Sequence, residues 1–245
     1  MSTTRREFMQ RSAVVVGSLL VTPGLPQDGV PDALPPALAA APTGPARVVA
    51  YVDGLSLYYG LKDRGWRRFY WLDAQALAQN LLRPGQQLAA TKYFTARVTA
   101  PGAAPQAALI EALSSLGGLR VFYGKYHANQ HLLRAGTSRP AAASEKSGDV
   151  NLAVQLLSDA VQDTFDVALI ISADSDLVPA VNACRELFPQ KRIVVAFPPR
   201  RVSEDLKQAA HAYVYIGRDK LARSLLAPEV PRLDGFLLKR PRNWE

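Results

Sequence analysis

Short, nearly uninterrupted apolar runs alternate with amphipathic segments from Arg47 to Ile216, over most of this chain of 245 residues. The runs RVVAYVD (47–53), DVALIIS (166–172) and KRIVVAF (191–197) carry apolar residues at consecutive positions. This is typical of strands that are buried on both faces. The segments between the runs repeat apolar residues at helical spacing. The alternation predicts an α/β fold whose mainly parallel central sheet is covered by helices on both faces.

The predicted elements follow this alternation along the chain. The predicted strands are 47–53, 88–98, 119–127, 166–172, 191–197 and 211–216. The predicted helices are 72–82, 104–117, 147–162, 174–187 and a last one from Gly217. Asp73 is predicted to cap the helix 72–82, because an aspartate there can accept hydrogen bonds from the first free amides. Gly117 and Gly118 are predicted to end the helix 104–117.

The first 46 residues are predicted to lie outside the folded domain. Residues 4–22, TRREFMQRSAVVVGSLLVT, resemble a twin-arginine export signal, and ALAAAP (37–42) offers a cleavage site at Ala40. The apolar part is too short to predict a stable membrane span. The alternative is a leader that carries two arginines by chance, or a start codon assigned too early. The predicted division is a leader and linker at 1–46, a domain at 47–216, and a C-terminal helix and basic tail at 217–245.

The charge balance points to a class of partner. The chain has a formal net charge of +8 and a pI near 9.7, which favours a polyanionic partner, nucleic acid before an anionic membrane. The single cysteine, Cys184, excludes an intramolecular disulfide, and with only 3 histidines beside it the sequence offers no His/Cys cluster of the zinc type. Nothing in the sequence indicates a homo-oligomer.

Aspartates follow or flank several predicted elements at the edge where the strands end. They are Asp53, Asp149, Asp174 and Asp176. Because crowded carboxylates repel one another unless a cation neutralises them, and because carboxylate oxygens suit hard ions, the set predicts a Mg²⁺ or Mn²⁺ centre. A pair of such ions can activate water for phosphodiester hydrolysis. Each residue also has a simpler explanation: Asp53 as a turn residue, Asp149 as a favourable charge at a helix start, and Asp174 as an N-cap.

Three segments together resemble the NYN domain, a PIN-like nuclease group that includes LabA-type bacterial proteins. They are YVDGLSLYYGL (51–61), EKSGDVNLAVQLLSDA (145–160) and ISADSDLVPAVNACREL (171–187). The resemblance covers 47–216 and implies a PIN-like three-layer sandwich, metal binding by the four aspartates, and ribonuclease activity. One position departs from the family pattern: Ser56 stands where the family usually has Asn, and a serine lacks the reach of the amide.

Several residues are predicted to position an RNA substrate: Ser56, Lys146, Arg97 and Arg200. Lys92 and Arg201 are further candidates for contacts with the RNA backbone. Tyr58 and Tyr59 are candidates for stacking on a base.

Three interpretations of the whole chain follow. The first is a metal-dependent endoribonuclease that hydrolyses RNA without a covalent intermediate. The second is an RNA-binding or regulatory module with an inactive centre, which Ser56 favours. The third is a haloacid-dehalogenase-like phosphatase, which also uses two aspartates two residues apart, but on its first strand. The compartment stays open, because the leader indicates export whereas the resemblance indicates the cytoplasm.

Overall fold

The structure is a computed structural model that describes residues 44–96, 103–124, 126–127, 144–145, 148–232 and 234–244. Residues 1–43, most of the predicted leader and linker, lie outside the described residues. Two predicted substrate-positioning residues, Arg97 and Lys146, also lie outside them. None of the helices in the described ranges is long and apolar enough to cross a membrane.

A six-stranded sheet, parallel throughout, forms the centre of the fold, in the order β3-β2-β1-β6-β7-β8. Its strands are β1 (Ala46–Asp53), β2 (Gln86–Ala96), β3 (Leu119–Gly124), β6 (Val167–Ile171), β7 (Arg192–Phe197) and β8 (Ala212–Tyr215). The chain builds outward from β1 through β2 and β3, returns to β6 beside β1, and builds outward again on the other side. The order therefore reverses between β1 and β6, and in open α/β sheets this switch point forms a crevice at the carboxyl ends of the strands.

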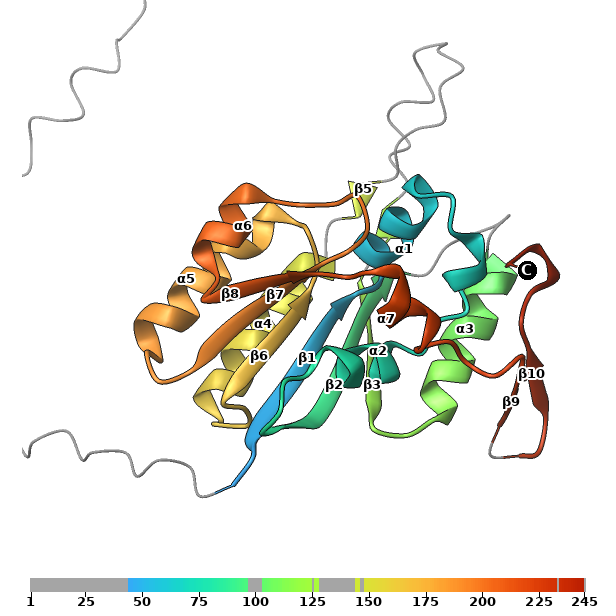
Figure 1. The fold of residues 1–245 in the computed structure, drawn as a ribbon, viewed down its shortest axis with the longest axis horizontal. Helices are drawn as coiled ribbons and strands as arrows, with labels where there is room; N and C mark the ends of the chain where they lie inside the picture. Colours follow the sequence, from blue (N-terminus) through green and yellow to red (C-terminus); the bar gives the residue numbers. More distant parts are fainter. Residues whose placement is uncertain are drawn as a thin grey trace, which may run out of the picture. The chain divides into compact units, whose positions relative to one another are not determined.

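Helices cover both faces of the sheet, so the predicted three-layer α/β sandwich is confirmed (Figure 1). One face carries α1 (Gly54–Asp63), α2 (Ala74–Leu81), α3 (Ala103–Ser115) and α7 (Arg218–Ala222). The other carries α4 (Gly148–Val161), α5 (Val178–Leu187) and α6 (Glu204–Ala209). In β1, Val48, Ala50 and Val52 enter the first core, whereas Val49 and Tyr51 enter the second. Burial on both faces explains why the strands are apolar at consecutive positions.

Local signals at the helix ends agree with the predictions in two places. The Asp73 carboxylate accepts hydrogen bonds from the backbone amides of Gln75 and Ala76, each at 2.9 Å, and caps α2. Gly117 and Gly118, with φ of 70° and 71°, follow α3. The predicted helix 174–187 differs, because its first turn is a separate 3-10 turn, η4 (Ser175–Leu177), and α5 begins only at Val178.

The helix α1, which directly follows the central strand β1, was not predicted from the sequence. Its two glycines lower helix propensity and its buried side chains are few, which hides the pattern. Gly60 is required by packing, because a Cβ there would lie 2.8 Å from the carbonyl oxygen of Pro199 and 2.9 Å from Cβ of Pro198. This close approach brings α1 against the turn that follows β7.

Short elements complete the structure. They are a 3-10 turn η2 (Arg67–Phe69), the antiparallel pair β4 (Tyr126–His127) and β5 (Ser144–Glu145), the antiparallel pair β9 (Glu229–Pro231) and β10 (Leu237–Lys239), and a 3-10 turn η5 (Arg242–Trp244). The predicted strand 119–127 is thus split, with β3 ending at Gly124.

The basic tail packs against the domain, which the sequence did not reveal. Trp244 is 8% exposed, and its ring centroid lies 5.6 Å from that of Tyr70 and 6.3 Å from that of Trp71. The indole nitrogen of Trp71 donates a hydrogen bond of 2.7 Å to the carbonyl oxygen of Ala227. Residues far apart in sequence therefore close the same apolar face.

A buried polar network joins α4 to the sheet. The Lys92 ammonium group lies 2.8 Å from the Asp159 carboxylate and 2.8 Å from the side-chain oxygen of Gln155. The Tyr51 hydroxyl donates a hydrogen bond of 2.6 Å to the other oxygen of Asp159. Lys92 is 8% exposed, so its charge anchors the helix that carries Asp149 in its first turn and does not face an RNA backbone.

Candidate metal centre

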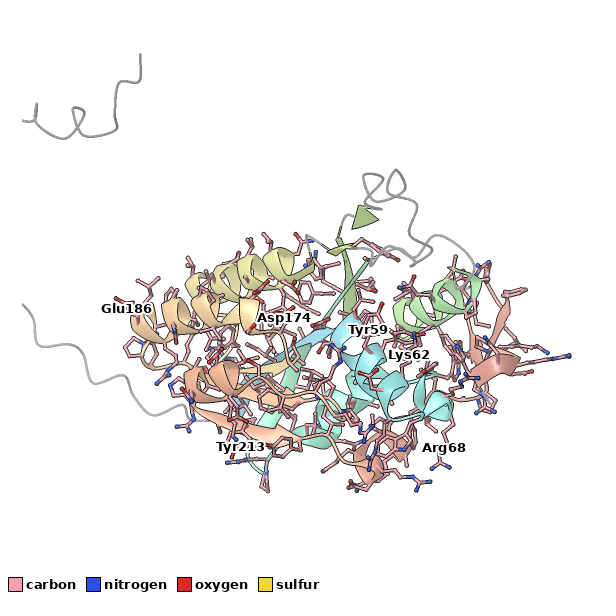
Figure 2. All side chains as sticks on the ribbon, turned by 90° about the horizontal axis from the view of Figure 1, so that it is seen from above. Tyr59, Lys62, Arg68, Asp174, Glu186 and Tyr213 are labelled. Atoms are coloured by element: carbon pink, nitrogen blue, oxygen red, sulfur yellow. The ribbon has the colours of Figure 1, made fainter. Side chains whose placement is uncertain are left out.

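The candidate site lies at the carboxyl edge of the sheet, where β1 and β6 end side by side. Asp53 is the last residue of β1, and Asp174 lies in the short loop after β6. Asp149 lies in the first turn of α4. Figure 2 shows this edge from above and labels Asp174 beside the end of the sheet. The switch in strand order explains why residues more than a hundred positions apart meet here.

Three of the predicted metal ligands form a cluster. One carboxylate oxygen from each of Asp149, Asp174 and Asp176 lies within 4.8 Å of the others. Burial, with the neighbouring charges of Asp174, Asp53 and Asp176, raises the pKa of Asp149 to about 7. A donor set made only of carboxylate oxygens suits a hard divalent cation. A cation placed between them would offset the mutual repulsion, so the residues present fit such an ion.

Asp53, the fourth predicted metal ligand, is not one of these three clustered carboxylates and is held by local hydrogen bonds. One oxygen accepts from the backbone amides of Leu55 (3.1 Å) and Ser56 (2.9 Å), which caps α1. The other accepts from the hydroxyl of Ser172 at 2.7 Å. Burial raises the pKa of Asp53 above its ordinary value despite these bonds. Asp53 therefore caps α1 and also places a carboxyl group in the wall of a pocket that opens at this edge of the sheet.

Asp174 combines a capping role with a place in the cluster. Its carboxylate accepts a hydrogen bond of 2.9 Å from the amide of Asp176 and caps η4. Its own amide donates to the Ser172 hydroxyl at 3.1 Å. The simpler explanation of Asp174 as an N-cap and its place among the clustered carboxylates are thus compatible.

Ser56 is buried, and its hydroxyl group binds the loop after β6. Its side-chain oxygen accepts a hydrogen bond of 3.0 Å from the amide of Ala173, and the residue is 6% exposed. The serine therefore ties the start of α1 to the segment that carries Asp174. Its role in positioning a substrate stays a prediction.

A pocket of about 430 Å³ opens over the carboxylates. Its wall consists of Asp53, Leu55, Ser56, Tyr59, Asp149, Ala173, Asp174, Ser175 and Arg201. A second hollow lies between α5 and α6 and shares Ser175 with it. Three members of the first wall were absent from the predicted site: Leu55, Ala173 and Ser175. Ser172 was not predicted either. The signal available in the sequence was a serine at the end of a strand, shortly before two aspartates.

Of the two adjacent arginines after β7, the pocket is lined by Arg201 and not by Arg200, the residue predicted to position the substrate. Arg200 has a φ of 58°, and its guanidinium lies 3.4 Å from the carbonyl oxygen of Asp63. Arg201 faces the Tyr59 ring, with its Cζ atom 5.4 Å from the ring centroid. A positive φ at a residue other than glycine could not be read from the sequence.

The match to a known protein family identifies this domain. The NYN domain matches residues 47–217, which include all four aspartates. The chain belongs to the NYN domain family. This family is part of the PIN-like superfamily, so the resemblance carried by the sequence motifs is confirmed.

Two individual proteins are similar to this NYN domain protein. The 6-hydroxy-3-succinoylpyridine 3-monooxygenase HspA of Pseudomonas putida (strain DSM 28022 / S16) is 28% identical over 241 residues, covering 82% of this chain and 76% of that protein. The crystal structure of a protein of unknown function from Vibrio parahaemolyticus RIMD 2210633 superimposes with a TM-score of 0.51. It shares 17% identity and covers 75% of this chain and 98% of that one, which supports the fold alone.

Proposed function

We propose that the protein is a divalent-metal-dependent ribonuclease that hydrolyses phosphodiester bonds of RNA. The observation that carries this proposal is the cluster of Asp149, Asp174 and Asp176, with oxygens within 4.8 Å of one another at the carboxyl edge of an NYN domain. The net charge of +8 supports a polyanionic substrate, since long-range attraction concentrates such a substrate at the surface.

Each residue has a defined part in this proposal. Asp149, Asp174 and Asp176 would hold Mg²⁺ or Mn²⁺ through carboxylate oxygens. When bound, the ion supplies a water of lowered pKa and stabilises the charge of the departing oxygen. Asp53 fixes the start of α1 and places a carboxyl group in the pocket wall, while Ser172 and Ser56 hold the loop that carries Asp174.

The test uses the full chain with end-labelled single-stranded RNA, and with Mg²⁺, Mn²⁺ or a chelator. We expect cleavage that requires the metal and is lost in Asp174→Asn. Asp205→Asn is the matched control, because Asp205 is an exposed aspartate at the start of α6, outside the pocket of the carboxylates. Metal binding by calorimetry without any cleavage would identify a binding module and overturn the ribonuclease proposal.

The similarity to a monooxygenase favours a second candidate function, oxygenation of a substituted pyridine. It rests on the 28% identity, which extends over 82% of this chain. A monooxygenase consumes dioxygen and a reductant, so the test measures dioxygen uptake with 6-hydroxy-3-succinoylpyridine and NADH, with and without added flavin. Uptake that depends on the pyridine would favour this function, and its absence alongside metal-dependent RNA cleavage would exclude it.

A further inference from the structure

Tyr59 on α1 and Arg201 in the turn after β7 lie in the wall of the acidic pocket, and Lys62 on α1 faces the same tyrosine ring. Tyr59 lines this pocket and is 42% exposed. The ammonium nitrogen of Lys62 lies 5.7 Å from the centroid of the Tyr59 ring, and Cζ of Arg201 lies 5.4 Å from it. Figure 2 labels Tyr59 and Lys62 together on α1, near Asp174. Tyr59 and Arg201 belong to the pocket wall but have no part in holding a metal ion, and Lys62 lies outside that wall.

The position of Arg201 is built into the backbone. Gly60 lets α1 approach the turn after β7, since a Cβ at this position would come within 2.8 Å of the Pro199 carbonyl oxygen. The turn is closed by a hydrogen bond of 3.2 Å from the Arg201 amide to the carbonyl oxygen of Pro198, and Arg200 adopts a φ of 58°. A non-glycine residue at positive φ is strained and persists only where the surroundings enforce it.

The side chain of Arg201 remains 39% exposed beside the pocket. Its Nε atom is buried without a hydrogen-bond partner and lies 3.5 Å from a carboxylate oxygen of Asp63. Within the described part of the chain, Arg201 forms its ion pair with Asp63 on α1 and not with the clustered carboxylates of the pocket. Among the residues that the structure describes, Arg201 is the one cationic residue in the wall of that pocket. A fork of donors beside a cluster of metal-binding type matches the geometry of a phosphate group.

We propose that Arg201 and Tyr59 form a nucleotide-binding subsite beside the carboxylates, in which Arg201 binds a phosphate oxygen and Tyr59 stacks on the neighbouring base. The proposal rests on the proposed ribonuclease function and names its substrate class. Because a base can stack on an exposed side chain only when it is unpaired, the subsite selects single-stranded RNA over duplex. Lys62 adds positive charge beside the same ring.

The first experiment measures binding of a fluorescein-labelled single-stranded RNA of ten nucleotides by anisotropy across a salt series. All variants carry Asp174→Asn, so that the RNA stays intact. Arg201→Ala should weaken binding about tenfold and reduce the salt slope by about 0.7, the value for one phosphate contact on a single strand. Arg68→Ala is the charge-matched control. Arg68 also faces a ring, with Cζ 4.7 Å from the centroid of Phe69, but it lies apart from Asp174 (Figure 2).

Stacking is tested at Tyr59. Tyr59→Ala should weaken binding to the single strand about tenfold, whereas Tyr59→Phe should keep wild-type affinity because it keeps the ring. Replacing the bases of the oligonucleotide by abasic sites, one position at a time, should abolish the Tyr59→Ala effect at one position. Affinity for an RNA duplex should respond to Arg201→Ala but not to Tyr59→Ala.

A second readout separates this proposal from the proposed function. With the catalytic carboxylates intact, Arg201→Ala should raise KM about tenfold and change kcat little, because the contact is made in the ground state as well. If the wild type cleaves RNA but Arg201→Ala and Arg68→Ala have the same salt slope and the same KM, the subsite proposal is overturned and the ribonuclease function stands. A wild-type chain that neither binds nor cleaves RNA would overturn both.

Discussion

Replacing Asp149 by asparagine should stabilise the metal-free protein while weakening its response to metal. The carboxyl group of Asp149 has a pKa raised from 3.8 to about 7, chiefly by burial and then by the charges of its neighbours. A rise of this size corresponds to about 4 kcal/mol against the ionised form. Because the side chain is only partly buried, we halve this figure for solvent screening and expect a gain of about 2 kcal/mol above pH 7.

The pH dependence of this gain has a defined sign. Since the folded-state pKa of Asp149 lies above its ordinary value, the folded protein keeps a proton that the unfolded chain has lost between about pH 4 and pH 7. The wild type therefore loses stability progressively across this window, and the asparagine variant does not. The difference in free energy of unfolding should be near zero at about pH 4 and level off above about pH 7.

The assay is urea unfolding followed by circular dichroism, in a chelator, at several pH values. In thermal unfolding, the same gain of about 2 kcal/mol would correspond to a rise in Tm of about 4–8 °C for a domain of this size. Adding Mn²⁺ should then stabilise the wild type more than the variant, because the ion replaces the missing countercharge. Asp205→Asn, on the exposed start of α6, should change stability by less than about 0.5 kcal/mol under every condition.

One result would refute this reasoning. If Asp149→Asn were no more stable than the wild type at pH 8 in chelator, or if its gain were the same at pH 5 and pH 8, repulsion in the cluster would not control the stability. An equal response of both proteins to Mn²⁺ would remove Asp149 from the ligand set.

Three further substitutions test the supporting structure, each by urea unfolding. Gly60→Ala should cost about 1–3 kcal/mol, because its Cβ meets the Pro199 carbonyl oxygen, and it should weaken RNA binding as Arg201→Ala does; unchanged stability would contradict the close approach. Ser172→Ala removes a hydrogen bond to a buried carboxylate and should cost about 1.5–3 kcal/mol, whereas Ser172→Thr should cost less. Lys92→Met leaves the Asp159 carboxylate buried without its cation and should cost about 3–5 kcal/mol; a loss below 1 kcal/mol would show that the network is solvated.

The sequence predicted the fold class because periodicity is a local property. Consecutive apolar residues in β1, β6 and β7 require burial on both faces, and together with the helical segments between them they indicate a parallel sheet between helical layers. The order of the strands depends on which layers pack together, and no local pattern states it. α1 was not predicted for a related reason. Gly60 is required by its close contact with the turn after β7, and this glycine lowers the helix propensity of the segment.

The candidate site was partly predictable. Asp53, Asp149, Asp174 and Asp176 were grouped because they were expected at the carboxyl edge of a parallel sheet, and the structure brings the last three of them together. Sequence could not distinguish Arg200 from Arg201, because the choice depends on a backbone angle enforced from outside the segment. Lys92 was assigned to the surface from its charge, whereas its partner Asp159 lies on a helix 67 positions further along the chain.

The reversal of strand order between β1 and β6 also divides the protein into two sequential halves of three sheet strands each. Along the sheet, the halves meet through the pairing of β1 with β6, and the Ser172 hydroxyl crosses that seam to Asp53. A backbone cut between residues 127 and 144 would therefore leave fragments that can recognise each other through unpaired strand edges. One fragment would carry Asp53 and Tyr59, and the other Asp149, Asp174 and Arg201. The complete pocket would then exist only in the reassembled pair, which makes this fold a natural candidate for a split reporter.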